Sequence, residues 1–152
     1  MKILLTGGAG YIGSHVLLSI LNDNHHVYVI DNLSTGNKNL IPKNIKFINC
    51  NINDEEILSN FLKKENFDIL LHFAGYIKVE ESVKNPEKYF ANNTDNAIKL
   101  FETCHKNGLN NIIFSSTAAA YGNPTNNDSI KEDEILKPLN PYGQSKVNTE
   151  NF

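Results

Sequence analysis

Tyr142 and Lys146 stand four residues apart in the stretch NPYGQSKVNTENF. At that spacing two side chains lie on the same face of a helix, and an ammonium group close to a phenol favours the ionised phenol. An ionised phenol can take a proton from an alcohol, which makes Tyr142 a candidate base. Taken alone, however, such a pair is more often an exposed tyrosine beside a solvated lysine, so the rest of the chain must decide.

A glycine-rich loop, TGGAGYIG, follows the first apolar run, with Gly7, Gly10 and Gly13 in the spacing T-G-x-x-G-x-x-G before an amphipathic segment. Glycines at these positions allow a tight turn, close approach of the backbone to a pyrophosphate, and close packing of a helix on a strand. The positive end of that helix would then face the phosphates. Asp31 follows about 20 positions further on, where a carboxylate could accept hydrogen bonds from ribose hydroxyls. The pattern favours a dinucleotide site over a structural turn with a coincidental aspartate.

The chain contains 14 basic residues besides histidine, and all of them are lysine. A 2′-phosphate on the adenosine ribose would meet the negative charge of Asp31, and such a phosphate is usually bound by arginine. We therefore predict NAD rather than NADP, although a lysine such as Lys38 could in principle bind a phosphate.

Apolar runs alternate with helix-like segments along the chain, which is typical of β-α-β units and a parallel sheet covered on both faces. The expected strands are Lys2 to Thr6, His26 to Asp31, Ile45 to Asn49, Asp68 to Phe73 and Asn111 to Ser116. The expected helices are Tyr11 to Asn22, Asp54 to Glu65, Pro86 to Lys106 and a last one from about Tyr142, after a loop from Gly122 to Pro141. We expect an α/β fold with a doubly wound, Rossmann-like sheet that ends after the fifth strand and the start of the following helix, in one domain, 1–152.

Length and charge narrow the function classes. With 152 residues, 40% apolar side chains and a net charge of −3, the chain has the composition of an ordinary globular domain and lacks the basic surface that nucleic acid or an anionic membrane attracts. No apolar run is long enough to span a membrane, and the start MKILLTGG lacks the features of a signal peptide. We expect a cytoplasmic protein that binds neither nucleic acid nor membrane.

The cysteines and histidines do not suggest a metal site or a disulfide. Cys50 and Cys104 form no C-x-x-C motif, and a cytoplasmic protein more often keeps such residues as buried thiols. The five histidines include one adjacent pair, His25 and His26, and the spacing of the five fits no ligand pattern. We predict no bound metal.

Five motifs occur in order: the glycine loop, DNLSTG, HFAG, FSSTAAAYG and NPYGQSK. Together they closely resemble the extended short-chain dehydrogenase/reductase family and, within it, the UDP-glucose 4-epimerases. The resemblance covers the whole chain, but members of the family are about twice as long, and their C-terminal half binds the nucleotide sugar. It implies an enzyme that interconverts UDP-glucose and UDP-galactose through a transient 4-keto sugar, with bound NAD.

The resemblance also implies roles for particular residues. Tyr142 would take the proton from the 4-hydroxyl of the sugar, and Lys146 would hydrogen-bond the nicotinamide ribose and favour the phenolate. Thr117 would hydrogen-bond the substrate oxygen, with Ser116 as the alternative. The residues expected to contact the cofactor are Gly7, Gly10, Tyr11, Ile12, Gly13, Asp31, Asn32, Leu33, Ser34, Thr35, Gly36, Asn51, Ile52, Phe73, Ala74, Gly75, Tyr76, Ile77, Asn92, Thr117, Tyr142 and Lys146.

The sequence departs from the family pattern at two positions. Asn51 replaces the usual aspartate beside the adenine, which would weaken one charge-assisted hydrogen bond. The position of Ile77 is lysine in some members of the family, and the following Lys78 receives no role.

Alternative functions remain open from the sequence. A nucleotide-sugar 4,6-dehydratase shares the fold, NAD and the tyrosine-lysine pair, but typically has an Asp-Glu pair directly after the hydroxyl residue, where this chain has Ala118 and Ala119. Another nucleotide-sugar epimerase, for example one acting on UDP-N-acetylglucosamine, has the same motifs. A non-catalytic NAD-binding protein often lacks the tyrosine and the lysine.

The length itself suggests an N-terminal fragment of such an enzyme, without the sugar-binding domain and inactive alone, and a homodimer is compatible with the sequence.

Overall fold

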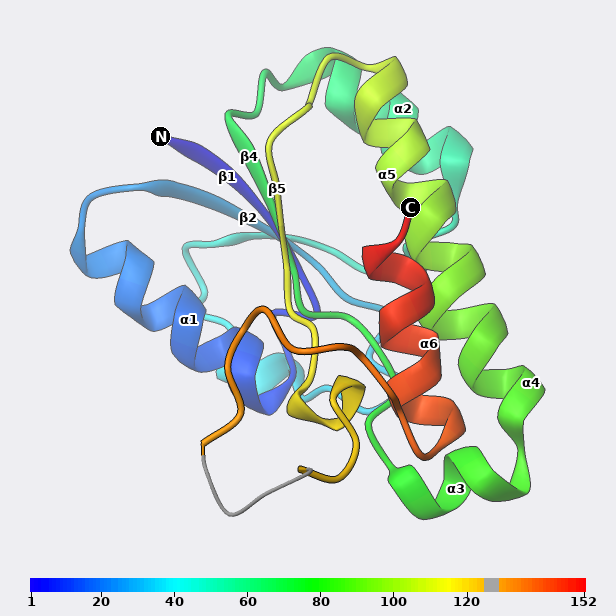
Figure 1. Ribbon diagram of the computed structural model, residues 1–152. Helices are drawn as coiled ribbons and strands as arrows, with labels where there is room; N and C mark the ends of the chain where they lie inside the picture. The colour runs from blue at the N-terminus through cyan, green and yellow to red at the C-terminus, as the bar shows by residue number, and fades with distance from the viewer. Residues whose placement is uncertain (125–128) are drawn as a thin grey trace. The chain divides into compact units, whose positions relative to one another are not determined.

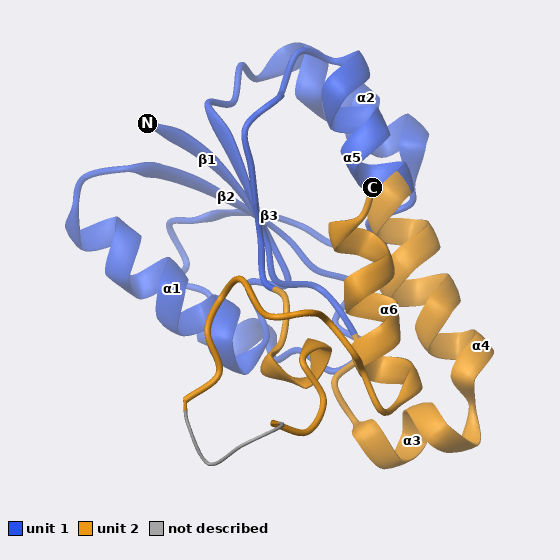
Figure 2. Cartoon of the chain, in the orientation of Figure 1, with its two compact units in different colours: residues 1–75, 99–115 blue, residues 76–98, 116–152 orange. Residues whose placement is uncertain are grey.

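The computed structural model describes residues 1–124 and 129–152, which form two compact units (Figure 2). Unit 1 comprises residues 1–75 and 99–115, and unit 2 comprises residues 76–98 and 116–152. The expected loop from Gly122 to Pro141 lies partly outside the described residues. A single domain over 1–152 stays a prediction.

Unit 1 contains a parallel five-stranded sheet in the order β3-β2-β1-β4-β5 (Figure 1). Its strands are β1 (Lys2–Thr6), β2 (His26–Ile30), β3 (Lys46–Ile48), β4 (Ile69–His72) and β5 (Ile112–Phe114). The buried Leu4 pairs with Tyr28 of β2 and with Leu70 of β4, which makes β1 the central strand. The Rossmann-like α/β fold is confirmed, and each strand begins or ends within two residues of its predicted bound.

Helices cover both faces of this sheet, as a doubly wound fold requires (Figure 2). Helix α1 (Tyr11–Asn22) lies on one side, where Leu17 belongs to a buried cluster with Ile3, Leu5 and Val29. Helix α2 (Glu55–Lys64) and the part of helix α5 (Asn96–Lys106) in unit 1 lie on the other side. There Phe101 meets His72 edge-to-face at 5.3 Å between ring centroids. The alternation of inward side chains along β1 explains the two layers: Ile3 and Leu5 face α1, and Leu4 faces the opposite way.

Unit 2 is mostly helical. It contains α3 (Val79–Lys84), α4 (Pro86–Tyr89), the π-helix η2 (Phe90–Asp95), the first residues of α5, the 3₁₀ turn η3 (Ala118–Ala120) and α6 (Pro141–Glu150). The helix predicted from Pro86 to Lys106 is present, but a wider π turn interrupts its hydrogen-bond pattern. Helix α3 was not predicted, because its apolar residues Val79 and Val83 are exposed and give no buried stripe. Another short 3₁₀ turn, η1 (Lys38–Leu40), lies in unit 1.

Both cysteines are free thiols and are buried, as predicted. Burial raises the pKa of the Cys50 thiol to about 11 and that of the Cys104 thiol to about 12. In the part of the chain that the structure describes, no three His, Cys, Asp or Glu side chains are grouped as metal ligands would be. No helix among those residues combines the length and the apolar character needed to cross a membrane.

Glu65 joins three elements of unit 1 through its carboxylate. Its two oxygens each lie 2.8 Å from an ammonium group, of Lys2 and of Lys46, and the Tyr28 hydroxyl donates to it at 3.2 Å. These hydrogen bonds, first that from Lys2, lower the pKa of the Glu65 carboxyl to about 2. A glutamate in an unfolded chain has a pKa of about 4.3. The group therefore contributes stability that is fully present above that value and is lost as the pH falls through about 2.

We expect Glu65→Gln to lower the free energy of unfolding at neutral pH, because glutamine keeps the shape but loses both ion pairs. The matched control is Glu55→Gln, since the Glu55 carboxylate lies 3.7 Å from the Lys106 ammonium with both side chains exposed. Urea unfolding at neutral and at acid pH measures the effect. The deficit of Glu65→Gln should exceed that of the control at pH 7 and shrink as the pH approaches 2; a deficit independent of pH would contradict the assignment.

Candidate active site

The glycine loop after β1 is packed so closely that no side chain fits at Gly7 or Gly13. Gly7 has φ +73°, its amide donates to the Ile30 carbonyl at 2.9 Å, and its carbonyl accepts from the Gly10 amide at 3.0 Å. A Cβ added to Gly7 would lie 2.4 Å from the Ala74 nitrogen, and one added to Gly13 would lie 2.2 Å from the Gly7 carbonyl oxygen. Both glycines are therefore required by backbone geometry, as the motif predicts.

The start of α1 fits an anionic group. Gly10 is the N-cap residue and provides no side-chain hydrogen bond, and the first turn of α1, which the structure describes in full, has no acidic residue. Tyr11 and Ile12 are 80% and 56% exposed, so their side chains do not cover the helix end. Amide groups at such a terminus attract phosphate oxygens.

Asp31 ties the end of β2 to the glycine loop, which sequence reasoning did not reveal. One carboxylate oxygen accepts from the Ala9 amide at 3.0 Å, and the other accepts from the Leu33 amide at 2.8 Å. The second bond holds Leu33 at φ +58°, an uncommon conformation for leucine. A carboxylate has about four acceptor positions. The two that remain would suffice for a ribose diol.

Asn32, which follows β2, and Asn51, which follows β3, are hydrogen-bonded to each other. The Asn32 amide donates to the Asn51 side-chain oxygen at 2.8 Å, and the Asn32 oxygen accepts from the Ser34 amide at 2.9 Å. The departure from the family pattern at Asn51 is thus accommodated within the protein, while the next residue, Ile52, is buried.

Within unit 1, most of the predicted cofactor residues lie at the carboxyl ends of the parallel strands. The glycine loop follows β1, Asp31 to Gly36 follow β2, and Phe73 to Gly75 follow β4. These are the carboxyl ends of three adjacent parallel strands, where β1 separates the two halves of the strand order. Ligands of doubly wound folds bind at this topological switch point.

Helix α6 of unit 2 carries Tyr142 and Lys146 on neighbouring turns, as predicted. The side chain of Asn140 caps its start by accepting from the Gly143 amide at 2.8 Å, and Pro141 occupies the first turn. Lys146 is only 4% exposed, whereas Tyr142 is half-buried. Burial lowers the pKa of the Lys146 ammonium to about 8, and the Glu150 carboxylate opposes that shift.

Thr117 and Ser116 are distinguished by their hydrogen bonds. The Ser116 hydroxyl bonds the Glu150 carboxylate, whereas Thr117 Oγ1 accepts from the Ala119 amide at 3.2 Å and keeps its own proton to donate. A Cβ on Gly143 would lie 2.7 Å from the Ala119 carbonyl oxygen, so α6 packs against the turn that Thr117 begins. The Thr117 hydroxyl thus keeps a proton to donate, and its contact with a substrate oxygen stays a prediction.

Asn93 is a buried link that sequence reasoning missed. Its side-chain oxygen accepts from the Tyr76 amide at 2.8 Å, and its amide nitrogen donates to the Tyr76 carbonyl at 2.9 Å and to Ser145 Oγ at 3.2 Å. Its backbone carbonyl accepts from the Thr149 hydroxyl at 2.9 Å. In the sequence, only the asparagine pair of ANNTDN hints at a buried polar residue here, and it does not indicate which of the two asparagines faces inward.

The predicted contact Asn92 is half-buried on the same π turn and donates to the Asn93 side-chain oxygen at 2.9 Å. Tyr76 is held by Asn93, while Ile77 is 71% exposed. Cofactor contacts at these unit 2 residues stay predictions.

The parallel sheet with its glycine loop defines a Rossmann-like α/β protein of the kind that binds dinucleotides. Residues 3–152 match the model of the family described as "NAD dependent epimerase/dehydratase family". The chain belongs to that family.

Individual relatives and solved structures point to the same family. The chain is 44% identical over 147 residues to the UDP-glucose 4-epimerase of Lacticaseibacillus casei, covering 97% of this chain and 44% of the relative. Its structure resembles the UDP-Glc/GlcNAc 4-epimerase of Campylobacter jejuni, with a TM-score of 0.93, 45% identity, and coverage of 99% of this chain and 47% of that one. It also resembles the Thermus thermophilus UDP-glucose 4-epimerase in complex with NAD. The TM-score is 0.95 at 32% identity, and the match covers 99% of this chain and 49% of that one. The chain thus spans about half the length of these relatives.

Proposed function

We propose that this chain provides the NAD site and the proton-transfer residues of a nucleotide-sugar 4-epimerase, with UDP-glucose and UDP-galactose as the preferred substrates. The observation that carries the proposal is the buried Lys146, one helical turn after Tyr142, on a helix that packs against the turn begun by Thr117. The similarity to UDP-glucose 4-epimerases over 97% or more of the chain supports the choice of substrate.

Residues of unit 1 would hold NAD. The uncapped start of α1 would bind the pyrophosphate, and the two free acceptor positions of Asp31 would bind the adenosine ribose. Bound NAD supplies a hydride acceptor that takes hydride from C4 of the sugar and returns it.

Residues of unit 2 would move the proton. Tyr142 would take it from the 4-hydroxyl of the sugar, and Thr117 would donate a hydrogen bond to the same oxygen. Lys146, which is buried one helical turn after Tyr142, would donate a hydrogen bond to a ribose hydroxyl. The same residues would return the proton to that oxygen at the end of the reaction.

The rival dehydratase reaction needs an acid and a base beside C5 and C6 of the sugar. Ala118 and Ala119 occupy those positions in η3 and have no ionisable group. A non-catalytic NAD-binding protein often lacks the tyrosine and the lysine, whereas this chain has both on one helix, with Lys146 buried.

The proposal is tested with a fused protein, in which this chain is joined to the C-terminal half of the Campylobacter jejuni enzyme. We expect NAD-dependent interconversion of UDP-glucose and UDP-galactose. Product analysis separates the alternatives, since a dehydratase would form a 4-keto-6-deoxy sugar, and a preference for UDP-N-acetylglucosamine would indicate a different epimerase. A fused protein that binds NAD but turns over none of these sugars would contradict the proposal.

We also expect NAD to bind more tightly than NADP, and Asp31→Asn to narrow that preference about tenfold, which corresponds to about 1.4 kcal/mol. Asparagine removes the charge that repels a 2′-phosphate but keeps one acceptor for the Ala9 or Leu33 amide. It is therefore a cleaner variant than Asp31→Ala, which would also loosen the loop.

Calorimetric titration with both cofactors measures this preference. Asp23→Asn is the control, because it removes the same charge at the other end of α1. Equal or tighter binding of NADP by the parent chain would refute the choice of cofactor.

A further inference from the structure

Tyr89, the last residue of α4, lies where three segments of unit 2 meet. Its side chain is fully buried. Its hydroxyl donates to the Glu81 carboxylate of α3 at 3.0 Å and accepts from the Lys78 amide, also at 3.0 Å. Its ring meets the ring of Tyr142 edge-to-face, with 6.4 Å between centroids and an angle of 84°. One side chain thus contacts both α3 and the candidate base on α6.

The hydroxyl of Tyr89 stays protonated and donates to Glu81. Burial and the Glu81 carboxylate raise the pKa of Tyr89 to about 12, so the phenol keeps its proton at any pH at which the protein would work. Glu81 is fixed in turn by the Lys88 ammonium at 2.5 Å, and that ammonium lies over the Tyr76 ring, 4.5 Å from its centroid.

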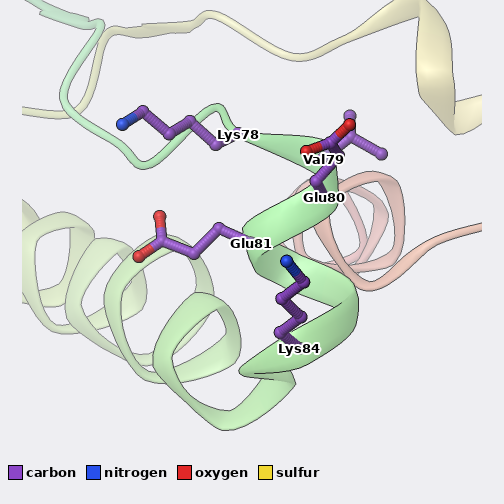
Figure 3. A pocket seen from close by; sticks show the side chains of 5 residues that line it. All are labelled: Lys78, Val79, Glu80, Glu81 and Lys84. Atoms are coloured by element: carbon purple, nitrogen blue, oxygen red, sulfur yellow. The ribbon is translucent and has the colours of Figure 1, made fainter.

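Glu81 reaches Tyr89 from the wall of a surface pocket that Lys78, Val79, Glu80 and Lys84 also line (Figure 3). The figure shows Glu81 and Lys78 extending in one direction from the start of α3, and Glu80 extending the other way. One oxygen of the Glu81 carboxylate accepts the hydrogen bond from the Tyr89 hydroxyl, and the other contacts the Lys88 ammonium.

We infer that Tyr89 is a positioning residue, which fixes the ring of Tyr142 in the orientation needed for proton transfer; this inference rests on the proposed role of Tyr142 as the base. Tyr142 is only half-buried, so its own surroundings restrict its ring less than a core position would. An edge-to-face contact with a ring that is itself pinned by two hydrogen bonds restricts that freedom. Because a small misplacement of a catalytic group lowers the rate by a large factor, a contact that fixes the Tyr142 ring would raise the rate.

The first test observes Tyr142 in the 152-residue chain by NMR with labelled tyrosine rings, assigned with Tyr142→Phe; the chain has six tyrosines. Tyr89→Leu should move the ring resonances of Tyr142 by several tenths of a ppm towards those of free tyrosine. Tyr89→Phe keeps the ring and should keep most of the original shift. Tyr28→Leu is the matched control, because it removes an edge-to-face contact with Phe67 in unit 1. It should leave the Tyr142 resonances unchanged.

The second test measures kinetics in the fused epimerase. Tyr89→Leu should lower kcat about tenfold and change KM for UDP-glucose less than about twofold. Tyr89→Phe keeps the ring but loses the two hydrogen bonds that pin it, so it should lower kcat about threefold. Glu81→Gln leaves both rings in place, and it should lower kcat about threefold, so it decides the matter if Tyr89→Leu fails to fold.

The inference is overturned if a folded Tyr89→Leu chain leaves the Tyr142 resonances unmoved, if Tyr28→Leu moves them equally, or if Glu81→Gln and Tyr89→Phe both leave kcat unchanged in the active fused protein. An inactive parent fusion would instead contradict the proposed function, since the NMR test reports on the two rings without turnover.

Discussion

Replacing Tyr142 by phenylalanine should lower the turnover of the fused epimerase by about 10²- to 10⁴-fold, while the affinity for NAD changes less than about twofold. The variant removes the hydroxyl that would take the proton but keeps the ring that meets Tyr89. The Tyr142 hydroxyl is not needed for the packing of α6, which depends on the close contact of Gly143 with Ala119 and on the hydrogen bonds of Ser145 and Thr149.

A coupled assay for UDP-glucose formation, with calorimetry for NAD, separates the two effects. Tyr28→Phe is the control, because it removes a tyrosine hydroxyl that donates to Glu65 in unit 1. Turnover of Tyr142→Phe close to that of the parent would show that Tyr142 is not the base.

A polypeptide of these 152 residues alone should show at least about 10⁴-fold less epimerase turnover than the fused protein, because binding of the nucleotide is what holds the sugar C4 against the hydride acceptor. The chain covers 42% to 44% of the length of its bacterial relatives. The resemblance assigns the nucleotide sugar to the half of those enzymes that lies beyond the matched residues. Binding of NAD should nevertheless persist, since the glycine loop and Asp31 belong to unit 1.

The purified chain, with its mass confirmed and host epimerase deleted, is assayed beside the fused protein at equal concentration. Turnover within about tenfold of the fused protein would show that these residues bind the nucleotide sugar themselves and would refute the prediction.

The elements with strong local signals were predictable from the sequence. Helix α1 has the predicted bounds, Tyr11–Asn22, because a glycine loop defines its start and an apolar stripe its length. Strand β1 has its predicted bounds, Lys2–Thr6, because it is apolar on both faces. The glycine positions were predictable for the same reason, since their requirement is a property of the local backbone.

Contacts between distant segments were not predictable. The bonds of Asn93 to Tyr76 and Ser145 join residues 17 and 52 positions apart, and nothing in the local sequence marks them. The contact of Tyr89 with Tyr142 is of the same kind. The double role of Asp31 was hidden for another reason: the motif that suggests ribose binding gives no sign that both oxygens also hold backbone amides.

The π turn Phe90–Asp95 fixes how many residues can separate Tyr89 from α5. A π turn contains about one residue more than an α turn, which rotates everything after it by about 100° relative to a regular helix. Tyr89 before the turn faces Tyr142, while Asn93 and Thr94 within it face Ser145. Deleting one residue would restore a regular helix and pull these two sets of contacts out of phase. Exposed Ala91 and Asp95 could accept many substitutions, yet the number of residues between Tyr89 and α5 has to stay the same.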